Sequence, residues 1–224
     1  MNKIQSVLFD LDGTFADTAP DLAFALNTLL GEQGYPELAF ETIRPHVSHG
    51  GAALIKLGFE KTPEDNEYEA LRTRFLDIYL DNIARETRLF DGMEQLLIEL
   101  ETNNIIWGIV TNKPGWLTDP LMKALNLDLR SACTVSGDTT AHAKPHPEPL
   151  LYACSQTGVK PEHCIYVGDA ERDIMAGKNA GMLTLTALFG YISESDQPET
   201  WQANAMINHP SEIMTFLKQK NADK

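Results

Sequence analysis

The chain places two carboxylates at the end of its first apolar run, in the stretch VLFDLDGTFADT (residues 7–18). Asp10 and Asp12 are one residue apart and follow directly on Val7, Leu8 and Phe9. Two like charges so close repel each other and shift each other's pKa, so the pair needs a compensating partner. A divalent cation would compensate both charges. An ordinary acidic turn, in which the aspartates accept backbone N–H bonds, is the alternative.

Further polar residues occur in three later segments. They are Thr111 and Asn112 after IIWGIV, Lys144 in the proline-rich loop AHAKPHPEP, and Asp169 and Asp173 in VGDAERD after CIYV. Each has a simple structural explanation alone, because Thr-Asn often caps a helix, a lysine between prolines is usually solvated, and acids suit a helix N-terminus. Their occurrence in this order at successive strand ends is much harder to assign to chance.

Taken together, these residues predict a site for phosphoryl transfer. Asp10, Asp12 and Asp169 supply the hard oxygen ligands that Mg²⁺ prefers, and they leave room for water and a phosphate oxygen. Asp10 is the candidate nucleophile, because a carboxylate can form an aspartyl-phosphate and divide a difficult hydrolysis into two steps. Asp12 can protonate the leaving alcohol and then activate water, and its backbone carbonyl is the alternative metal ligand to its carboxylate.

Three further residues are expected to bind the phosphoryl group. The metal and Lys144 would offset the repulsion between the Asp10 carboxylate and a phosphate dianion. Thr111 and Asn112 would donate hydrogen bonds to the phosphoryl oxygens, which is an electrostatic role directed at the transition state.

Such a site needs strands that end at a common edge. Helical patterns separate five apolar runs, each of which ends in a polar or glycine-containing loop; this alternation indicates an α/β fold with a parallel sheet covered on both faces. Ligands of such sheets bind beyond the carboxyl ends of the strands, where these polar residues fall. The five runs are SVLFDLDGT, IIWGIVTNKPG, CTVSGD, CIYVGDAERD and LTLTALFGY.

The segment from about residue 16 to residue 88 is different, because it shows helical spacing without a convincing strand. We predict a helical domain, residues 16–85, inserted into an α/β core domain made of residues 1–15 and 86–224. The two domains would face each other across the end of the first strand, and domain interfaces commonly hold pockets.

Composition limits the possible partners. The 224 residues are 43% hydrophobic and 22% charged, and the net charge of −14 opposes nucleic-acid binding but not binding of a small anion beside local cations. No apolar run approaches the roughly 18 residues of a membrane span, and the three cysteines, without CxxC spacing, indicate reduced thiols. We therefore expect a cytoplasmic monomer or homodimer with no nucleic-acid or membrane partner.

The motifs DLDGT, VTN, the lysine of AKPHPEP, and GDAERD resemble, in this order, the four motifs of the haloacid dehalogenase-like phosphatases. The resemblance spans nearly the whole chain. It implies a Rossmann-like core with an inserted helical cap domain, and Mg²⁺-dependent hydrolysis through an aspartyl-phosphate. It implies that Asp10 is the nucleophile and Asp12 the general acid and base. Asp169 would be a metal ligand, and Asp173 would support the metal site or Lys144. Thr111 and Lys144 would bind the phosphate.

Finer likenesses point to a branch of this family. Dehalogenases and phosphonoacetaldehyde hydrolases of the family lack an acid two residues after the nucleophile, so Asp12 opposes both activities. The stretch VSHGGAAL (residues 47–54) resembles the VGxGxxxL cap loop of phosphoglycolate phosphatases, with Ser48 in place of the first glycine. LFDGMEQLL, WGIVTNKP and GYISESDQPETWQANAMINHPSEI resemble the N-acetylmuramic acid 6-phosphate phosphatases of bacterial cell-wall recycling. The implied substrate is a small carboxylate-bearing phosphate ester, N-acetylmuramic acid 6-phosphate or 2-phosphoglycolate.

Four cap residues, Arg44, His46, Ser48 and His49, are expected to face the pocket, and Arg44 to pair with a substrate carboxylate. The alternative is that Arg44 and the histidines are solvated cap surface. Two other functions stay open. A sugar-phosphate mutase of the same family would use the same residues but return the phosphoryl group to the sugar, and a non-catalytic module would only bind a phosphate ligand.

Overall fold

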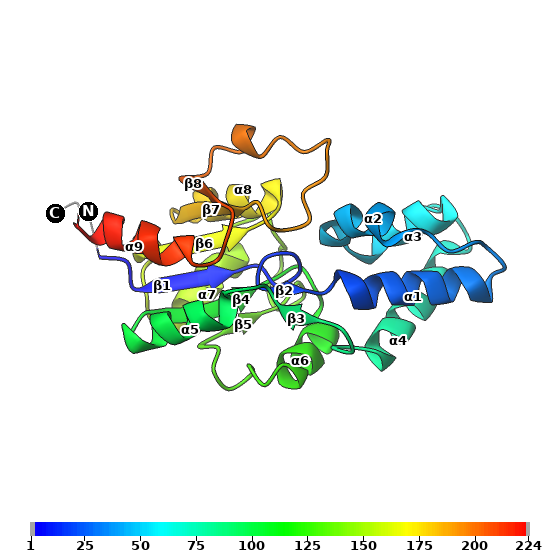
Figure 1. Cartoon of the computed structure of the whole chain (residues 1–224), viewed down its shortest axis with the longest axis horizontal. Helices are drawn as coiled ribbons and strands as arrows, with labels where there is room; N and C mark the ends of the chain where they lie inside the picture. The colour runs from blue at the N-terminus through cyan, green and yellow to red at the C-terminus, as the bar shows by residue number, and fades with distance from the viewer. Residues whose placement is uncertain (1–2, 223–224) are drawn as a thin grey trace.

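The computed structural model describes residues 3–222 and contains a six-stranded parallel sheet (Figure 1). The strand order is β5-β4-β1-β6-β7-β8, and every neighbouring pair is parallel. The strands are β1 (Ser6–Phe9), β4 (Ile106–Val110), β5 (Thr134–Val135), β6 (Cys164–Gly168), β7 (Leu183–Ala187) and β8 (Ala205–Ile207). Each of the five runs predicted as strands contributes one strand, and the α/β class is confirmed. β8 was not predicted, because three residues are too few to show a period.

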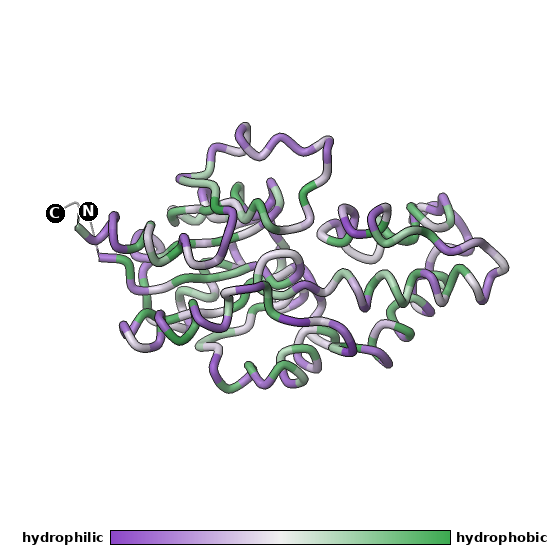
Figure 2. The backbone as a smooth tube through the Cα atoms, in the orientation of Figure 1, coloured by the Kyte–Doolittle hydropathy of each residue, from purple (hydrophilic) through white to green (hydrophobic). Residues whose placement is uncertain are grey.

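Helices cover both faces of the sheet, which explains why its strands are apolar throughout. Val7 and Phe9 of β1 lie in the buried cluster of one face, and Leu8 lies in that of the other, as expected when successive side chains alternate. The first face is covered by α5 (Met93–Thr102), α6 (Gly115–Ala124) and α9 (Glu212–Ala222), and the second by α7 (Glu148–Thr157) and α8 (Glu171–Asn179). Figure 2 shows hydrophobic residues concentrated along the central strands.

A lobe of helices extends from the sheet at the end opposite the chain termini (Figure 1). It consists of α1 (Ala19–Glu32), α2 (Phe40–Ile43), a 3₁₀ helix η1 (Arg44–His49), α3 (Gly50–Phe59) and α4 (Tyr68–Asp81). Residues 18–87, all described, include no strand, whereas the ends of the segment predicted to lack strands, about residues 16 to 88, do hold strand residues, at 16–17 and at 88. The apolar sides of these helices form a third buried cluster, which also includes Leu117 of α6 and Tyr191 after β7, so the core of the lobe continues onto the sheet domain.

Two short strands connect the lobe to the sheet domain. β2 (Ala16–Asp17) pairs antiparallel with β3 (Arg88–Leu89), so the chain enters and leaves the lobe at one place. The buried carboxylate of Asp21, in the first turn of α1, accepts hydrogen bonds from the Glu86 N–H (2.9 Å), the Thr87 N–H (3.0 Å) and the Thr87 hydroxyl (2.7 Å). The domain boundaries predicted from the sequence fall beside this connection. We call residues 18–87 the cap.

The sequence led us to expect reduced thiols and no membrane-spanning segment. Cys133, Cys154 and Cys164 are all free thiols, and the sulfur atoms of the latter two lie 3.8 Å apart. Among the described residues, no helix has the length and apolar character that crossing a lipid bilayer requires.

Candidate active site

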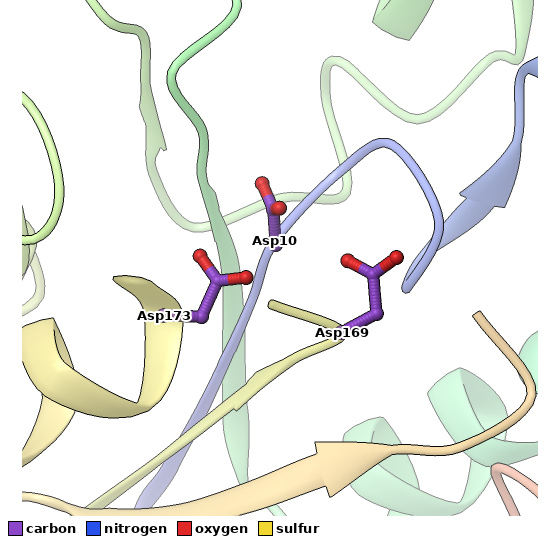
Figure 3. Close-up of side chains that lie close together, drawn as sticks. All are labelled: Asp10, Asp169 and Asp173. Atoms are coloured by element: carbon purple, nitrogen blue, oxygen red, sulfur yellow. The ribbon is translucent and has the colours of Figure 1, made fainter. Parts of the chain in front are cut away.

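Three carboxylates come together at the carboxyl edge of the sheet, and Figure 3 shows them gathered around one space. Asp10 is the first residue after β1, Asp169 is the first after β6, and Asp173 lies in the first turn of α8. One oxygen atom of each lies within 4.8 Å of an oxygen of the other two, and all three residues are buried. The adjacency follows from the parallel pairing of β1 with β6, which places the ends of the two strands side by side.

Two glycines allow Asp169 to lie against the backbone. A Cβ atom on Gly13 would lie 2.2 Å from Asp169 Oδ2, and one on Gly190 would lie 2.3 Å from Asp169 Cβ. Gly13 also has φ +85°, a conformation that residues with a side chain rarely adopt. Asp169 Oδ2 accepts a hydrogen bond from the Tyr191 N–H (2.9 Å). The glycine of the DLDGT motif is therefore needed both for the turn and for the position of a distant carboxylate.

Lys144 is the positive partner of this cluster. Its ammonium nitrogen lies 2.8 Å from Asp10 Oδ1 and 2.8 Å from Asp173 Oδ1, and its side chain is fully buried. It also donates hydrogen bonds to the Val110 carbonyl (3.0 Å) and the Tyr166 hydroxyl (2.7 Å). The simpler interpretation of Lys144 as a solvated loop residue is therefore wrong, because the loop directs this side chain into the protein.

Thr111 and Asn112 follow β4 and support the site differently. The Thr111 hydroxyl accepts the Lys113 N–H (3.1 Å), which leaves its own proton for a ligand in the cavity. The Asn112 side chain is engaged on both sides, since it donates to the Lys144 carbonyl (3.0 Å) and accepts the Lys144 N–H (2.9 Å). Asn112 was predicted to bind phosphoryl oxygens, but its amide holds the Lys144 loop in this structure.

The carboxylate cluster carries more negative than positive charge. Burial, together with repulsion from Asp10 and Asp173, raises the pKa of Asp169 to about 7. Burial also raises the pKa of Asp173, although Lys144 acts in the opposite direction. Buried charges need compensation, and three carboxylates of this kind are hard oxygen donors. The donor set therefore fits Mg²⁺, which was the predicted cofactor.

Asp12 faces away from the three-carboxylate cluster. Its Oδ1 accepts hydrogen bonds from Lys113 Nζ (3.0 Å) and the Thr18 hydroxyl (2.6 Å). Burial lowers the pKa of Lys113, but the neighbouring Asp12 carboxylate and Tyr79 outweigh this effect and raise it overall. The Asp12 carboxylate is thus paired with Lys113 rather than placed with Asp10 and Asp169, which leaves its backbone carbonyl as the atom for the predicted metal contact.

A cavity of about 360 Å³ lies between the sheet domain and the cap. From the strand ends it is lined by Asp10, Asp12, Thr111, Asn112 and Lys113, and from the cap by the stretch 47–52 and one side of α4. A second cavity of about 220 Å³ lies beside Asp169. The first volume lies near the lower end of the range for ligand sites, about 300 to 1,000 Å³, and the second lies below that range.

Two of the predicted cap residues, Ser48 and His49, line both cavities. The Ser48 hydroxyl donates to Asp169 Oδ2 (2.6 Å), and the Ser48 carbonyl accepts a hydrogen bond from Arg172 (2.5 Å). Burial and the positive charge of Arg172 lower the pKa of His49, which favours its neutral form. The serine that replaces a family glycine therefore joins the cap to the carboxylate cluster.

The other two predicted cap residues lie elsewhere. The Arg44 guanidinium donates to the carbonyls of Gly190 (3.1 Å) and Phe189 (3.3 Å) and lies 4.9 Å from the centre of the Tyr191 ring. Neither Arg44 nor His46 lines either of the two cavities at this site. The expectation that Arg44 meets a substrate carboxylate is not supported, because Arg44 lines neither cavity and two of its five N–H donors bond the loop after β7.

Sequence reasoning missed several residues of the site. Arg172 lies inside GDAERD and Lys113 directly follows VTN, and neither was assigned a role, although both are cations next to predicted site residues. Tyr166 in β6 shows no signal beyond being apolar enough for a strand, yet its hydroxyl accepts from Lys144 and donates to the Val110 carbonyl (2.7 Å). Arg72 lies on a cap helix with many other charged residues, and only the fold shows that it faces the cavity.

Comparison with known proteins agrees with this geometry. Relatives include an N-acetylmuramic acid 6-phosphate phosphatase of Pseudomonas putida, 40% identical over 96% of this chain and 96% of its own. A phosphoglycolate phosphatase of Xanthomonas campestris pv. campestris is 42% identical over 93% of this chain and 94% of its own. A crystal structure of a predicted phosphoglycolate phosphatase from Haemophilus somnus superimposes with a TM-score of 0.85 at 25% identity, covering 96% of this chain and 99% of the other.

The family model described as haloacid dehalogenase-like hydrolase matches residues 7–187, which include the four sequence motifs and the whole cap. The resemblance drawn from the motifs and the predicted enzyme class, a phosphatase, are thereby confirmed. With relatives aligned over nearly its full length, the chain belongs to the haloacid dehalogenase-like hydrolase family.

Proposed function

We propose that this protein is a Mg²⁺-dependent phosphomonoesterase that acts through an aspartyl-phosphate on Asp10. The observation that carries the proposal is the placement of Asp10 in a cavity wall, in contact with the buried ammonium of Lys144 and close to the carboxylates of Asp169 and Asp173. A carboxylate held in this way is fixed in position and lies beside positive charge. Those are the conditions under which it can attack a phosphate dianion.

In the first step, an Asp10 oxygen forms a bond to phosphorus and the bond from phosphorus to the ester oxygen breaks. Asp12 donates a proton to the leaving alkoxide. Its carboxylate faces Lys113 and Thr18 in this structure, so the proposal includes a side-chain rotation toward Asp10. Lys144 and the Thr111 hydroxyl offset the charge on the phosphoryl oxygens.

In the second step, Asp12 accepts a proton from water, which attacks the phosphorus of the aspartyl-phosphate and releases inorganic phosphate and the free Asp10 carboxylate. Asp10, Asp169 and the Asp12 carbonyl would hold Mg²⁺, with Asp173 positioning Lys144. When bound, this ion supplies positive charge to the phosphoryl oxygens throughout the reaction.

For the substrate we propose a small phosphate ester that carries a carboxylate, either N-acetylmuramic acid 6-phosphate or 2-phosphoglycolate. The relatives' names support both, since each is named for one of the two substrates. The cavity supports the same class, because Lys113, Arg172 and Arg72 all line it in a chain of strongly negative net charge. The expected cytoplasmic location and the choice between monomer and homodimer stay predictions.

The test compares Asp10→Asn with Asp128→Asn, a control at an exposed position. Phosphate release is measured with Mg²⁺ over a panel that includes both proposed substrates and simple hexose phosphates. We expect Asp10→Asn to lose at least about a thousandfold in kcat, as for the loss of other covalent nucleophiles, and the control to match the wild type.

Acid-quenched samples analysed by mass spectrometry provide a second readout. The wild type should carry one added phosphoryl group, Asp12→Asn should accumulate it because water activation is lost, and Asp10→Asn should carry none. Wild-type turnover by Asp10→Asn would refute the nucleophile assignment. Isomerised sugar phosphate with little free phosphate would instead indicate the mutase.

A further inference from the structure

One side of the cap helix α4 faces the cavity. Arg72, Phe75, Leu76 and Tyr79 all line it, and their spacing of three, four and seven residues places them in one row along the helix. Arg74, two residues from Arg72, lies on the outside of the same helix and forms an exposed ion pair with Glu32. The row therefore presents a cation at one end, two apolar side chains in the middle and an aromatic ring at the other end.

Arg72 differs from the other cations at the cavity. Lys113 is paired with Asp12, and Arg172 donates to the Ser48 carbonyl. Within residues 3–222, Arg72 forms no ion pair and no hydrogen bond, although it is half-buried. A guanidinium offers five donors in a planar fork that matches a carboxylate, so an unpaired arginine in a cavity wall is a binding group for such an anion.

We propose that Arg72 binds the substrate's carboxylate and so determines which phosphate esters this enzyme accepts. The proposal rests on the proposed function and refines it. In this role Arg72 replaces the predicted Arg44, which lines neither cavity and bonds the Gly190 and Phe189 carbonyls after β7.

The position of Arg72 on α4 favours a long substrate. Tyr79 marks the catalytic end of the row, because its ring lies 4.5 Å from Lys113 Nζ, which is paired with Asp12. Arg72 lies seven residues before Tyr79, so their Cα atoms are about 10 Å apart along the helix. Because side chains of an α-helix lean toward its N-terminus, the Arg72 guanidinium leans away from Tyr79.

The two proposed substrates differ in how far the carboxylate lies from phosphorus. In 2-phosphoglycolate three bonds of about 1.5 Å separate phosphorus from the carboxylate carbon, a reach of about 4 Å. In N-acetylmuramic acid 6-phosphate eight such bonds intervene, a reach of up to about 10 Å. The reach of the longer molecule matches the length of the row on α4, so that its phosphate would lie at Asp10, its carboxylate at Arg72 and its sugar beside Leu76.

The experiment uses Arg72→Gln and Arg72→Lys, with Arg74→Gln as the matched control on the same helix. Each protein is assayed with N-acetylmuramic acid 6-phosphate and with N-acetylglucosamine 6-phosphate, which lacks the lactyl carboxylate. For Arg72→Gln we expect kcat/KM to fall about 30- to 1,000-fold for the first ester, the usual effect of removing one partner of a buried charged pair, and to change less than about threefold for the second.

Arg72→Lys should recover part of the loss, because a lysine restores the charge but not the bidentate geometry. Arg74→Gln should leave both values unchanged. Equal losses on both esters would mean that Arg72 only stabilises the cap, and an unchanged value for the carboxylate ester would mean that Arg72 does not bind it. Either result overturns the proposal.

A binding measurement separates this proposal from the proposed function. Calorimetry with N-acetylmuramic acid, which has no phosphate to transfer, should detect binding to the wild type and a dissociation constant at least about tenfold higher for Arg72→Gln. This difference would support Arg72 even if no ester were hydrolysed. Equal dissociation constants would refute it even if hydrolysis occurred as proposed.

Discussion

Asp169 shows how much a single side chain at this site depends on residues far along the chain. It contacts the backbone of Gly13 and Gly190, accepts a hydrogen bond from the Tyr191 N–H, and receives the Ser48 hydroxyl from the cap. A carboxylate enclosed in this way has little freedom to rotate. Its orientation is set before any ligand arrives, which is what a metal ligand or an electrostatic partner requires.

We predict that Gly13→Ala lowers the free energy of unfolding by about 2 to 4 kcal/mol, since the added methyl group meets Asp169 Oδ2 and the backbone keeps a positive φ. Phosphatase activity should fall at least about a hundredfold, because the carboxylate must move. Urea denaturation and initial rates of phosphate release measure the two effects.

Gly158→Ala is the matched control. Gly158 has φ +71°, and no neighbouring atom lies within 4 Å of the place that an added methyl group would take, so only the backbone strain is added, about 1 kcal/mol. Its activity should equal that of the wild type. If the two variants lost activity equally, the close approach of Gly13 to Asp169 would not matter for function.

For single residues, the sequence predicted which side chains lie close together at the site but not which of them form hydrogen bonds or ion pairs with each other. The order of the motifs and the parallel strands were enough to bring Asp10, Asp169 and Lys144 together. The partner of each side chain depends on rotamers and on neighbours from other elements, which no local pattern contains. Asp12 could therefore be placed near the site, but its bond to Lys113 could not be foreseen.

The first turn of helix α1 holds the connection between the sheet domain and the cap. Asp21 accepts three hydrogen bonds there from residues 86 and 87, which lie on the returning chain segment beside β3. The entry and exit strands of the cap are only two residues long each, so their pairing alone contributes little. Asp21 therefore provides much of the stability of this junction.

We predict that Asp21→Ala lowers the free energy of unfolding by about 2 to 4 kcal/mol, because two backbone N–H groups and a hydroxyl lose their acceptor in a buried place. Residues 82–88 should become sensitive to limited proteolysis. Asp65→Ala is the comparison, since Asp65 accepts the Thr62 N–H (2.8 Å) in an outer loop of the cap. A change in protease sensitivity as large in Asp65→Ala would show that the junction has no special role.

Element positions were predictable where periodicity was strong. The long helices of the cap and the five apolar strands follow from spacing, but β8 and the pair β2–β3 were missed, because strands of two or three residues carry no period. The side of α4 that faces the cavity could not be assigned either. That choice depends on how the cap packs on the sheet domain.

Considered as a whole, the molecule is two packed bodies, and the buried carboxylate cluster lies in the sheet domain beside the cavities that the cap helps to line. Metal binding at this cluster should change the stability of the whole protein. Mg²⁺ should raise the melting temperature by about 5 to 10 °C at a free concentration 100 times its dissociation constant, which corresponds to about 2.7 kcal/mol, and EDTA should reverse the shift. Differential scanning fluorimetry measures this, with NaCl of equal ionic strength as the control.

Asp169→Asn should remove most of this metal-induced shift. The same variant should be at least as stable as the wild type without metal, because one charge leaves a buried cluster of three carboxylates. A full Mg²⁺ shift in Asp169→Asn would exclude this cluster as the site of the ion.

The contact between Ser48 and Asp169 has a consequence for how the two bodies move. The Ser48 hydroxyl belongs to the cap, and the Asp169 carboxylate that accepts its hydrogen bond belongs to the sheet domain. A cation that binds Asp169 therefore also changes the free energy of the closed position of the cap. Because such coupling is reciprocal, cap closure changes the affinity for the cation by the same factor as the bound cation changes the equilibrium constant for cap closure. If the proposed Mg²⁺ binds Asp169, its retention and any opening of the cap are accordingly one coupled equilibrium.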